Sequence, residues 1–386
     1  MSWLPHEIVY CSNVHPYSTL DGLREQLIKH VLPIKQKRNL NSMALGLWLN
    51  QALVNEILAN PEKMLTLTKL FEQEKLIILT LNAFPQETFH AEQVKANVYL
   101  PDWSDNARFN YTKQLVKIIC QYSSLFNNEV SISTVPLGYK RGWCADKHAI
   151  ACNHLSSLSK LLAEVKKSAA KHVTVCLEME PDCVLESSQE MVAFFQNDLM
   201  IAKYPEIRRH LGVCFDICHQ AVMHENINDS LTLFEKSGIT IGKIQVSNAL
   251  QFNNSDRHVV LTELEPYMHS PYLHQIKTQL HNRILSTDDL SPLTLTRLTE
   301  QGVSRVHFHV PINRQKLTDT ITTTQKSILA TLDYLELAKI KPNLEVETYT
   351  WALIDGDADS EQLNQHLVSE LTWLTEQLAH RNLLVG

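Results

Sequence analysis

The segment that decides the fold is Val173-Thr174-Val175-Cys176-Leu177-Glu178-Met179-Glu180, an apolar run that ends in two acidic residues. Its ending recurs as Leu344-Glu345-Val346-Glu347. Side chains alternate across a strand, so the two carboxylates of each ending share one face. In an apolar interior such a pair is costly unless a cation, a proton or strong donors compensate it. The repeat therefore predicts two buried strands whose carboxylates meet a divalent metal ion. The alternative is a pair of edge strands whose glutamates face water.

Short strand-like segments alternate with longer amphipathic segments along the rest of the chain. The predicted strands span residues 8–15, 44–50, 76–84, 130–137, 173–180, 211–217, 242–247 and 343–349. The predicted helices include residues 19–36, 52–72, 107–126, 149–168, 188–202, 320–339 and 360–379. A repeated strand-then-helix order indicates a parallel sheet covered by helices, and eight repeats favour a closed (β/α)8 TIM barrel over an open sheet. The chain contains neither GxGxxG nor GxxxxGK[ST], which weakens nucleotide-binding alternatives.

A ninth strand-like run, residues 305–312, lies between the seventh and eighth repeats. The segment before it, residues 248–304, is therefore expected to be an insertion in the barrel. It is polar, rich in His, Asn and Ser, and follows a barrel strand on the side where lids and substrate loops belong. We expect a single TIM-barrel domain over residues 1–386 in which this insertion forms a partial lid.

Composition narrows the class of function. The net charge of −7 argues against nucleic acid or an anionic membrane as a partner, and 44% hydrophobic with 20% charged residues is typical of a globular protein. No stretch approaches the roughly 20 apolar residues of a membrane span. The eight cysteines form no CxxC motif and several lie in apolar runs, which indicates reduced thiols. These features predict a cytoplasmic protein that acts on a small molecule.

A third carboxylate joins the two glutamate pairs. Asp216 ends the sixth predicted strand, and His219 follows on the next turn. In barrel order Asp216 lies between Glu178 on the fifth strand and Glu347 on the eighth, so three carboxylates are expected at one mouth. Oxygen ligands in this number suit Mn, Mg or Co, and an added histidine would shift the preference toward Mn, Co or Zn. The alternative for Asp216 is a helix cap with an incidental histidine nearby.

The fourth ligand is left open by the sequence. The seventh strand offers Gln245 as its inward polar group, whereas the ninth run offers His307 and His309 on one face. Either histidine could equally be a hydrogen-bonded core residue.

Polar side chains also follow the first and third predicted strands, namely Asn13, His15 and Asn82. The ends of barrel strands are where substrates bind, although each of these residues is also a common cap or turn former. We expect them to line a substrate pocket.

The chain resembles the xylose-isomerase-like TIM barrels, the sugar and sugar-phosphate isomerase/epimerase superfamily. That family holds its metal with a Glu on strand five, an Asp on six, a His on seven and a Glu on eight. Glu178, Asp216 and Glu347 match three of these positions, and Gln245 stands where the family has its histidine. The spacing of Asp216 and His219 is similar to the ketose epimerase pattern, in which the histidine contacts substrate. If the family's metal site is present here, His309 would have to fold back and take the ligand position that Gln245 leaves vacant.

Over nearly its whole length the chain also resembles the EboE-type metabolite traffic proteins of the bacterial ebo gene cluster. The phrases that carry this resemblance are residues 10–16, 80–85, 98–103, 131–134, 214–221, 306–311 and 344–351. The family implies a barrel and an association with processing or trafficking of a secondary-metabolite precursor. It also implies other proteins of the same gene cluster as possible partners.

What the superfamily resemblance implies is a metal-dependent isomerase or epimerase of a small polyhydroxylated or sugar-like metabolite. The metal would bind adjacent carbonyl and hydroxyl oxygens and ease removal of a proton from the carbon beside them. Glu178 and Glu347 would be acid and base as well as ligands, and Asp216 a ligand only. His219 would orient the substrate, and Glu180 would bind it or tune the site.

Two alternatives come from other classes. A barrel that binds a metabolite and hands it to a partner without turnover would need only the pocket, and Gln245 favours it. A metal-dependent hydrolase of the endonuclease IV type shares the fold but requires more histidine ligands and a basic surface, which the net charge does not favour.

Overall fold

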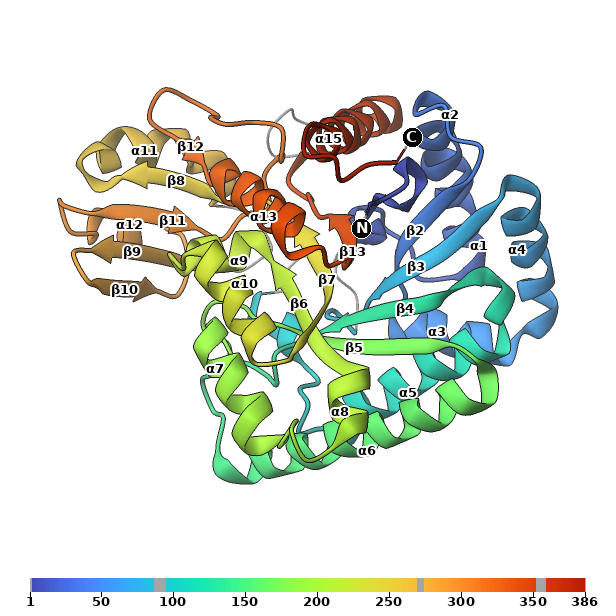
Figure 1. The fold of residues 1–386 in the computed structure, drawn as a ribbon. Helices are drawn as coiled ribbons and strands as arrows, with labels where there is room; N and C mark the ends of the chain where they lie inside the picture. Colours follow the sequence, from blue (N-terminus) through green and yellow to red (C-terminus); the bar gives the residue numbers. More distant parts are fainter. Residues whose placement is uncertain (1, 87–94, 269–273, 352–358, 386) are drawn as a thin grey trace.

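Eight parallel strands form a barrel at the centre of the fold (Figure 1). The computed structural model describes residues 2–86, 95–268, 274–351 and 359–385. The barrel strands are β1 (Val9–Tyr10), β2 (Met43–Trp48), β3 (Leu76–Asn82), β4 (Phe126–Thr134), β5 (His172–Glu178), β6 (Leu211–Asp216), β7 (Thr240–Val246) and β13 (Asn343–Val346). They are ordered β1-β13-β7-β6-β5-β4-β3-β2, and a parallel bridge between Cys11 and Gly46 closes the ring. The predicted TIM barrel is confirmed, and each predicted strand overlaps one of these eight.

Helices cover the outside of the barrel. They are α1 (Leu20–Gln26), α2 (Leu32–Lys37), α3 (Gln51–Ala59), α4 (Pro61–Glu74), α5 (Asn106–Gln121), α6 (Ala145–Ala169), α7 (Ser188–Ala193), α8 (Pro205–His210), α9 (Ile217–Val222), α10 (Ile227–Lys236), α13 (Gln325–Ala338) and α15 (Ser360–His380). One predicted helix, residues 52–72, is wrong as a single element. It divides at Asn60, whose φ is −126°, because Pro61 lacks an N–H donor and begins a new helix instead.

The insertion folds as a second, antiparallel sheet beside the barrel (Figure 1). Its strands, in the order β10-β9-β11-β8-β12, are β8 (Leu250–Asn253), β9 (Ile276–Leu280), β10 (Arg283–Thr287), β11 (Val303–Val306) and β12 (Thr322–Thr323). Helices α11 (Arg257–Glu263) and α12 (Pro292–Thr296) accompany it. A hydrophobic cluster of its own, which includes Phe252, Ile276 and Phe308, stabilises this unit. Residues 269–273 of the predicted insertion lie outside the described part of the chain.

Two sequence-based expectations about this region are corrected. The predicted ninth strand, residues 305–312, is a strand only up to Val306, because its pairing with β8 and β9 ends there. The insertion also does not stop at Ser304: β11 lies inside the antiparallel sheet, and β12 pairs with β8 at residues 322–323, which the sequence assigned to a helix. The segment after β11 therefore returns from the insertion toward the barrel.

The cysteines and the helices bear on disulfide bonds and on membrane spans, respectively. All eight cysteines are free thiols, and five of them are buried. In the described ranges, no helix combines the length and apolarity needed to cross a membrane.

Candidate metal centre

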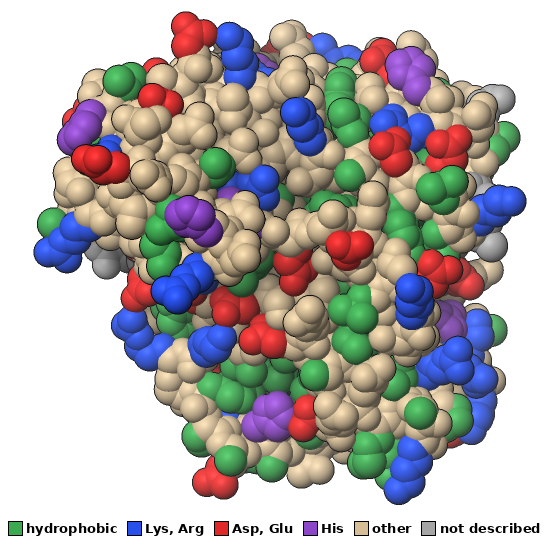
Figure 2. Space-filling model, turned by 60° about the vertical axis from the view of Figure 1, so that its left-hand side comes forward, with side chains coloured by type: hydrophobic (Ala, Val, Ile, Leu, Met, Phe, Trp, Pro, Cys, Tyr) green, Lys and Arg blue, Asp and Glu red, His purple; other side chains and the backbone are tan. Residues whose placement is uncertain are grey.

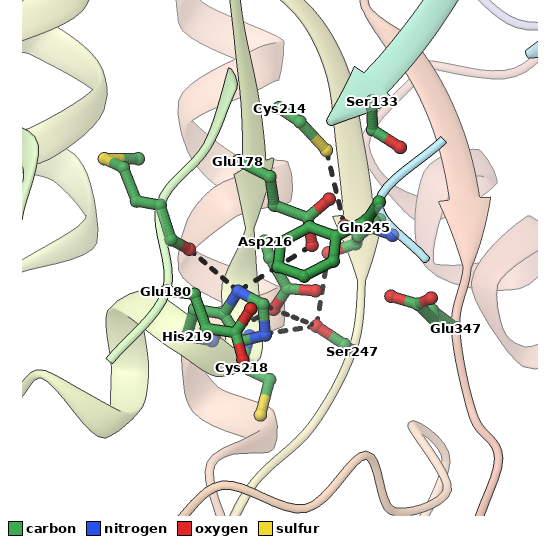
Figure 3. A network of polar contacts seen from close by, with 12 residues as sticks. Ser133, Glu178, Glu180, Cys214, Asp216, Cys218, His219, Gln245, Ser247 and Glu347 are labelled. Atoms are coloured by element: carbon green, nitrogen blue, oxygen red, sulfur yellow. Dashed lines mark hydrogen bonds and ion pairs between the residues drawn. The ribbon is translucent and has the colours of Figure 1, made fainter. Parts of the chain in front are cut away.

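Three carboxylates meet where barrel strands end. Glu178 is the last residue of β5, Asp216 is the last residue of β6, and Glu347 directly follows β13. All three are buried, with exposed fractions of 3%, 0% and 5%. One oxygen from each lies within 4.8 Å of the others, so the structure brings the three predicted carboxylates together (Figure 3). The C-terminal mouth of a barrel is the usual place for a TIM-barrel active site.

In their ionised forms these three carboxylates would repel one another. Among the described residues, Glu178 Oε2 and Asp216 Oδ2 have no hydrogen-bond partner, although both atoms are buried. Burial, reinforced by the charges of Glu347 and Asp216, raises the pKa of Glu178 well above its ordinary value. Burial also raises the pKa of Glu347 to about 7. Buried ionised groups are normally paired or bound to a metal, so this donor set fits a divalent cation.

Asp216 and Glu347 are each held by hydrogen bonds to one carboxylate oxygen. Asp216 Oδ1 accepts hydrogen bonds from Ser247 Oγ at 2.7 Å and from the His219 backbone N at 2.9 Å, where Asp216 caps α9 (Figure 3). Glu347 Oε1 accepts from Asn13 Nδ2 at 2.9 Å and from Asn82 Nδ2 at 3.1 Å. The second oxygen of each carboxylate is left for another partner. Such bonds fix the orientation of metal ligands in proteins.

A histidine from the insertion reaches this group. The return segment after β11 places His309 Nε2 at 3.9 Å from Asp216 Oδ2 and His309 Nδ1 at 3.6 Å from Glu347 Oε2. Gln245 on β7 is buried, and its Oε1 accepts a hydrogen bond from Cys214 Sγ at 3.3 Å (Figure 3). Of the two histidines that the sequence left open, His307 and His309, it is His309 whose ring lies beside Asp216 and Glu347.

Two other predicted site residues, Glu180 and His219, lie beside His307 in a neighbouring cluster. One ligand atom from each of the three is within 4.8 Å of the others. Glu180 Oε1 accepts a hydrogen bond from Tyr99 at 2.7 Å. Burial lowers the pKa of His219 to about 4 and raises that of Glu180 to about 8. Strand and helix periodicity did not identify Tyr99 as a site residue, because it lies between β3 and α5 in a stretch without either pattern.

His15 has a different setting. Its Nε2 lies 2.9 Å from the Tyr10 hydroxyl, and its ring stacks on His30 with centroids 4.0 Å apart. These contacts pack the turn after β1, so a substrate contact by His15 stays a prediction.

The second carboxylate of the eighth strand is compensated by a lysine that the sequence analysis missed. Lys243 Nζ on β7 lies 2.7 Å from Glu345 Oε1, and both side chains are fully buried inside the barrel. The expectation that one metal compensates both glutamates of this strand is therefore wrong for Glu345. The alternation of the seventh strand could have indicated Lys243, because it shares the inward face with Gln245.

The surface of the insertion side carries mixed charge. Figure 2 shows Lys and Arg side chains interspersed with Asp and Glu over this face. Together with the net charge of −7, this distribution differs from the basic stripe of a nucleic-acid-binding surface.

Comparisons with known proteins place the fold. No profile of a known family and no curated protein matches this chain. A D-tagatose 3-epimerase-like protein of known structure is 12% identical, over 99% of this chain and 98% of that one, with a TM-score of 0.52. A xylose isomerase domain protein from Planctomyces limnophilus is 11% identical, over 91% and 93%, with a TM-score of 0.51. An IOLI protein with a zinc atom bound is 12% identical, over 99% of both chains, with a TM-score of 0.50. The fold is therefore that of the xylose-isomerase-like TIM barrels.

Proposed function

We propose that this protein is a metal-dependent isomerase or epimerase of a small sugar-like metabolite. The observation that carries the proposal is a pair of buried carboxylate oxygens, Glu178 Oε2 and Asp216 Oδ2. Within the described residues neither oxygen has a hydrogen-bond partner. Glu347 and His309 lie close to this pair. The names of structurally similar proteins, a xylose isomerase domain protein and a D-tagatose 3-epimerase-like protein, agree with this class of reaction.

The residues that would hold the ion are Glu178, Asp216, His309 and Glu347. Three carboxylates with one imidazole suit Mn, Co or Zn, and Mg less well because it prefers oxygen ligands alone. A divalent ion bound there would supply positive charge to the carbonyl and hydroxyl oxygens of a substrate. In this chain His309 would replace the histidine that other members carry on strand seven.

Glu178 and Glu347 would exchange protons with the substrate. One carboxylate would take the proton from the carbon beside the substrate carbonyl and the other would return a proton, so no oxidant or reductant is required. Asn13 and Asn82 would keep Glu347 in position through its Oε1. His219 would orient the substrate as the third catalytic residue.

Four further residues would contact the substrate. Glu180, fixed by Tyr99, would face the substrate from the end of β5. Asn13, His15 and Asn82 would line the pocket from the first and third strands. The insertion would act as a partial lid within one TIM-barrel domain, because its Gln275 donates a hydrogen bond at 3.0 Å to the carbonyl of Pro181 after β5.

A second candidate is a metabolite-binding protein that hands its ligand to another protein without turnover. Gln245 favours it, since the strand-seven position of the superfamily ligand is occupied by an amide bonded to Cys214. The resemblance to EboE-type metabolite traffic proteins points the same way and would make other proteins of that gene cluster the partners. Free thiols at all eight cysteines agree with the cytoplasm as its location.

A metal-dependent hydrolase of the endonuclease IV type is a third candidate. The three neighbouring histidines, His219, His307 and His309, favour it. The net charge of −7 and the mixed surface charge favour a small substrate instead.

Proton exchange with solvent separates the first two candidates. Protein supplied with Mn, Co or Zn is incubated in D2O with a panel of ketoses and ketose phosphates, and deuterium at carbon is followed by NMR. We expect deuterium beside the carbonyl of at least one sugar, and a loss of about 100-fold or more in that rate for Glu178→Gln. Binding of a sugar with no deuterium incorporation, at an affinity that Glu178→Gln preserves, would instead identify a carrier.

A further inference from the structure

We infer that His219, His307 and Glu180 form a second metal site beside the carboxylate site. One ligand atom from each lies within 4.8 Å of the others, and all three side chains are buried. The proposed function uses a single ion and assigns His219 and Glu180 to the substrate, so this second ion goes beyond that proposal. It does not depend on it, because its ligands differ from the four assigned above.

The hydrogen bonds of His219 leave one ring nitrogen without a proton. Its Nδ1 lies 2.8 Å from the backbone carbonyl of Met179. A carbonyl oxygen only accepts hydrogen bonds, so Nδ1 carries the proton of the neutral ring and Nε2 presents a lone pair. That Nε2 lies 3.0 Å from His307 Nε2.

His307 is bound in the same way. Its Nδ1 lies 2.8 Å from Gln275 Oε1. The amide orientation of Gln275 follows from its Nε2, which donates to the Pro181 carbonyl at 3.0 Å and to the Tyr99 hydroxyl at 3.1 Å. The oxygen of the amide therefore faces His307, Nδ1 carries the proton, and Nε2 of His307 is also a bare acceptor.

Two ring nitrogens that face each other at this distance need a proton or a metal ion between them. Two acceptors that face each other without a proton repel, whereas two nitrogens bound at about 2.0–2.1 Å to one tetrahedral zinc lie about 3.3–3.4 Å apart. The observed 3.0 Å between His219 Nε2 and His307 Nε2 is close to that spacing. Glu180 adds a carboxylate whose Oε1 is already fixed by Tyr99. Two imidazoles and a carboxylate are ligands that Zn and Co accept.

His309 links the two sites. Its Nδ1 faces the backbone carbonyl of Glu347 at 3.1 Å, so its Nε2 is the third bare nitrogen. That atom lies 3.3 Å from His219 Nε2 and 3.9 Å from Asp216 Oδ2. Two ions would therefore be neighbours at one end of the barrel, with His309 between their ligand sets.

Metal stoichiometry of matched variants tests the second site. In His307→Asn the amide nitrogen can take the place of Nδ1 and keep the bond to Gln275, while Nε2 is removed. His210→Asn is the control, because His210 is buried and, like His307, presents Nδ1 to an amide oxygen. That oxygen is the backbone carbonyl of Val173, at 3.0 Å, at the opposite end of β6. After loading with Zn or Co and gel filtration, we expect two ions per chain in the wild type and in His210→Asn, and one in His307→Asn.

The same measurement on Glu178→Gln separates this inference from the proposed function. Loss of one ion in Glu178→Gln but none in His307→Asn would overturn the second site and leave the first. Loss of one ion in His307→Asn but none in Glu178→Gln would support the second site. It would also contradict the metal site on which the proposed function depends. Anomalous diffraction from zinc-loaded wild-type crystals does not depend on how a variant folds. A peak between His219 and His307 is expected, and a crystal with zinc only at the carboxylates would contradict the inference.

Discussion

Glu347→Gln is expected to remove one metal ion per chain and to abolish turnover. Asn13 and Asn82 both donate to Glu347 Oε1, so a glutamine must present its oxygen to those two donors. Its NH2 group then replaces Oε2, the oxygen that lies 3.6 Å from His309 Nδ1 and faces the carboxylate site. An NH2 group repels a cation. The affinity should fall by more than about 100-fold, since loss of a group that only orients a ligand already costs about 10–100-fold.

Elemental analysis of protein loaded with Mn, Co or Zn checks this result. Glu361→Gln is the matched control, because it makes the same change of charge at an exposed carboxylate that pairs with Lys37. His309→Ala should lose the same ion as Glu347→Gln if His309 belongs to that site. An unchanged metal content in Glu347→Gln would exclude Glu347 as a ligand. It would also contradict the acid/base role proposed for Glu347.

The barrel and its acidic mouth could be predicted because both depend on local patterns. The alternation around Glu178 predicted an inward-facing carboxylate, and the apolar run before Asp216 predicted a strand that ends there; the structure has both at the ends of β5 and β6. Parallel strands bring their carboxyl ends to one edge, so sequence order was sufficient to group Asp216 and Glu347 with the glutamates of the fifth strand. It could not decide between Glu178 and Glu180, because alternation places both side chains on the same face.

The identity of the fourth residue beside these carboxylates depends on long-range structure. His309 reaches Asp216 only because the antiparallel sheet of the insertion turns the chain back after Val306. No local pattern near His309 encodes that path. The same holds for Gln275 and Tyr99, whose bonds decide which nitrogen of His307 is free and which oxygen of Glu180 is fixed. Their roles follow from tertiary contacts across more than one element.

Lys243→Met is expected to cost the fold about 3–5 kcal/mol, the range for breaking a buried ion pair by removing one partner. Burial is the largest single influence and lowers the pKa of Lys243, but the neighbouring groups, with Glu345 first among them, together raise it, so the lysine is charged. Its Nζ lies 2.7 Å from Glu345 Oε1 and 3.0 Å from Ser133 Oγ, with no exposed surface on Lys243 or Glu345. Methionine fills the space and leaves Glu345 as an uncompensated carboxylate. Urea denaturation followed by circular dichroism measures the loss.

Close packing around Glu345 explains why we do not expect water to hydrate its carboxylate after Lys243 is replaced. A Cβ added at Gly46 would lie 2.0 Å from Glu345 Oε2, so the carboxylate packs directly against the Gly46 backbone and no water fits between them. Lys243→Met with Glu345→Gln should therefore recover part of the loss, because the pair of substitutions removes the buried charge. Lys167→Met is the control: Lys167 lies at the same 2.7 Å from Glu164, but both are exposed, and such pairs contribute about 0–1 kcal/mol. Equal effects of Lys243→Met and Lys167→Met would mean that Lys243 is not what compensates Glu345.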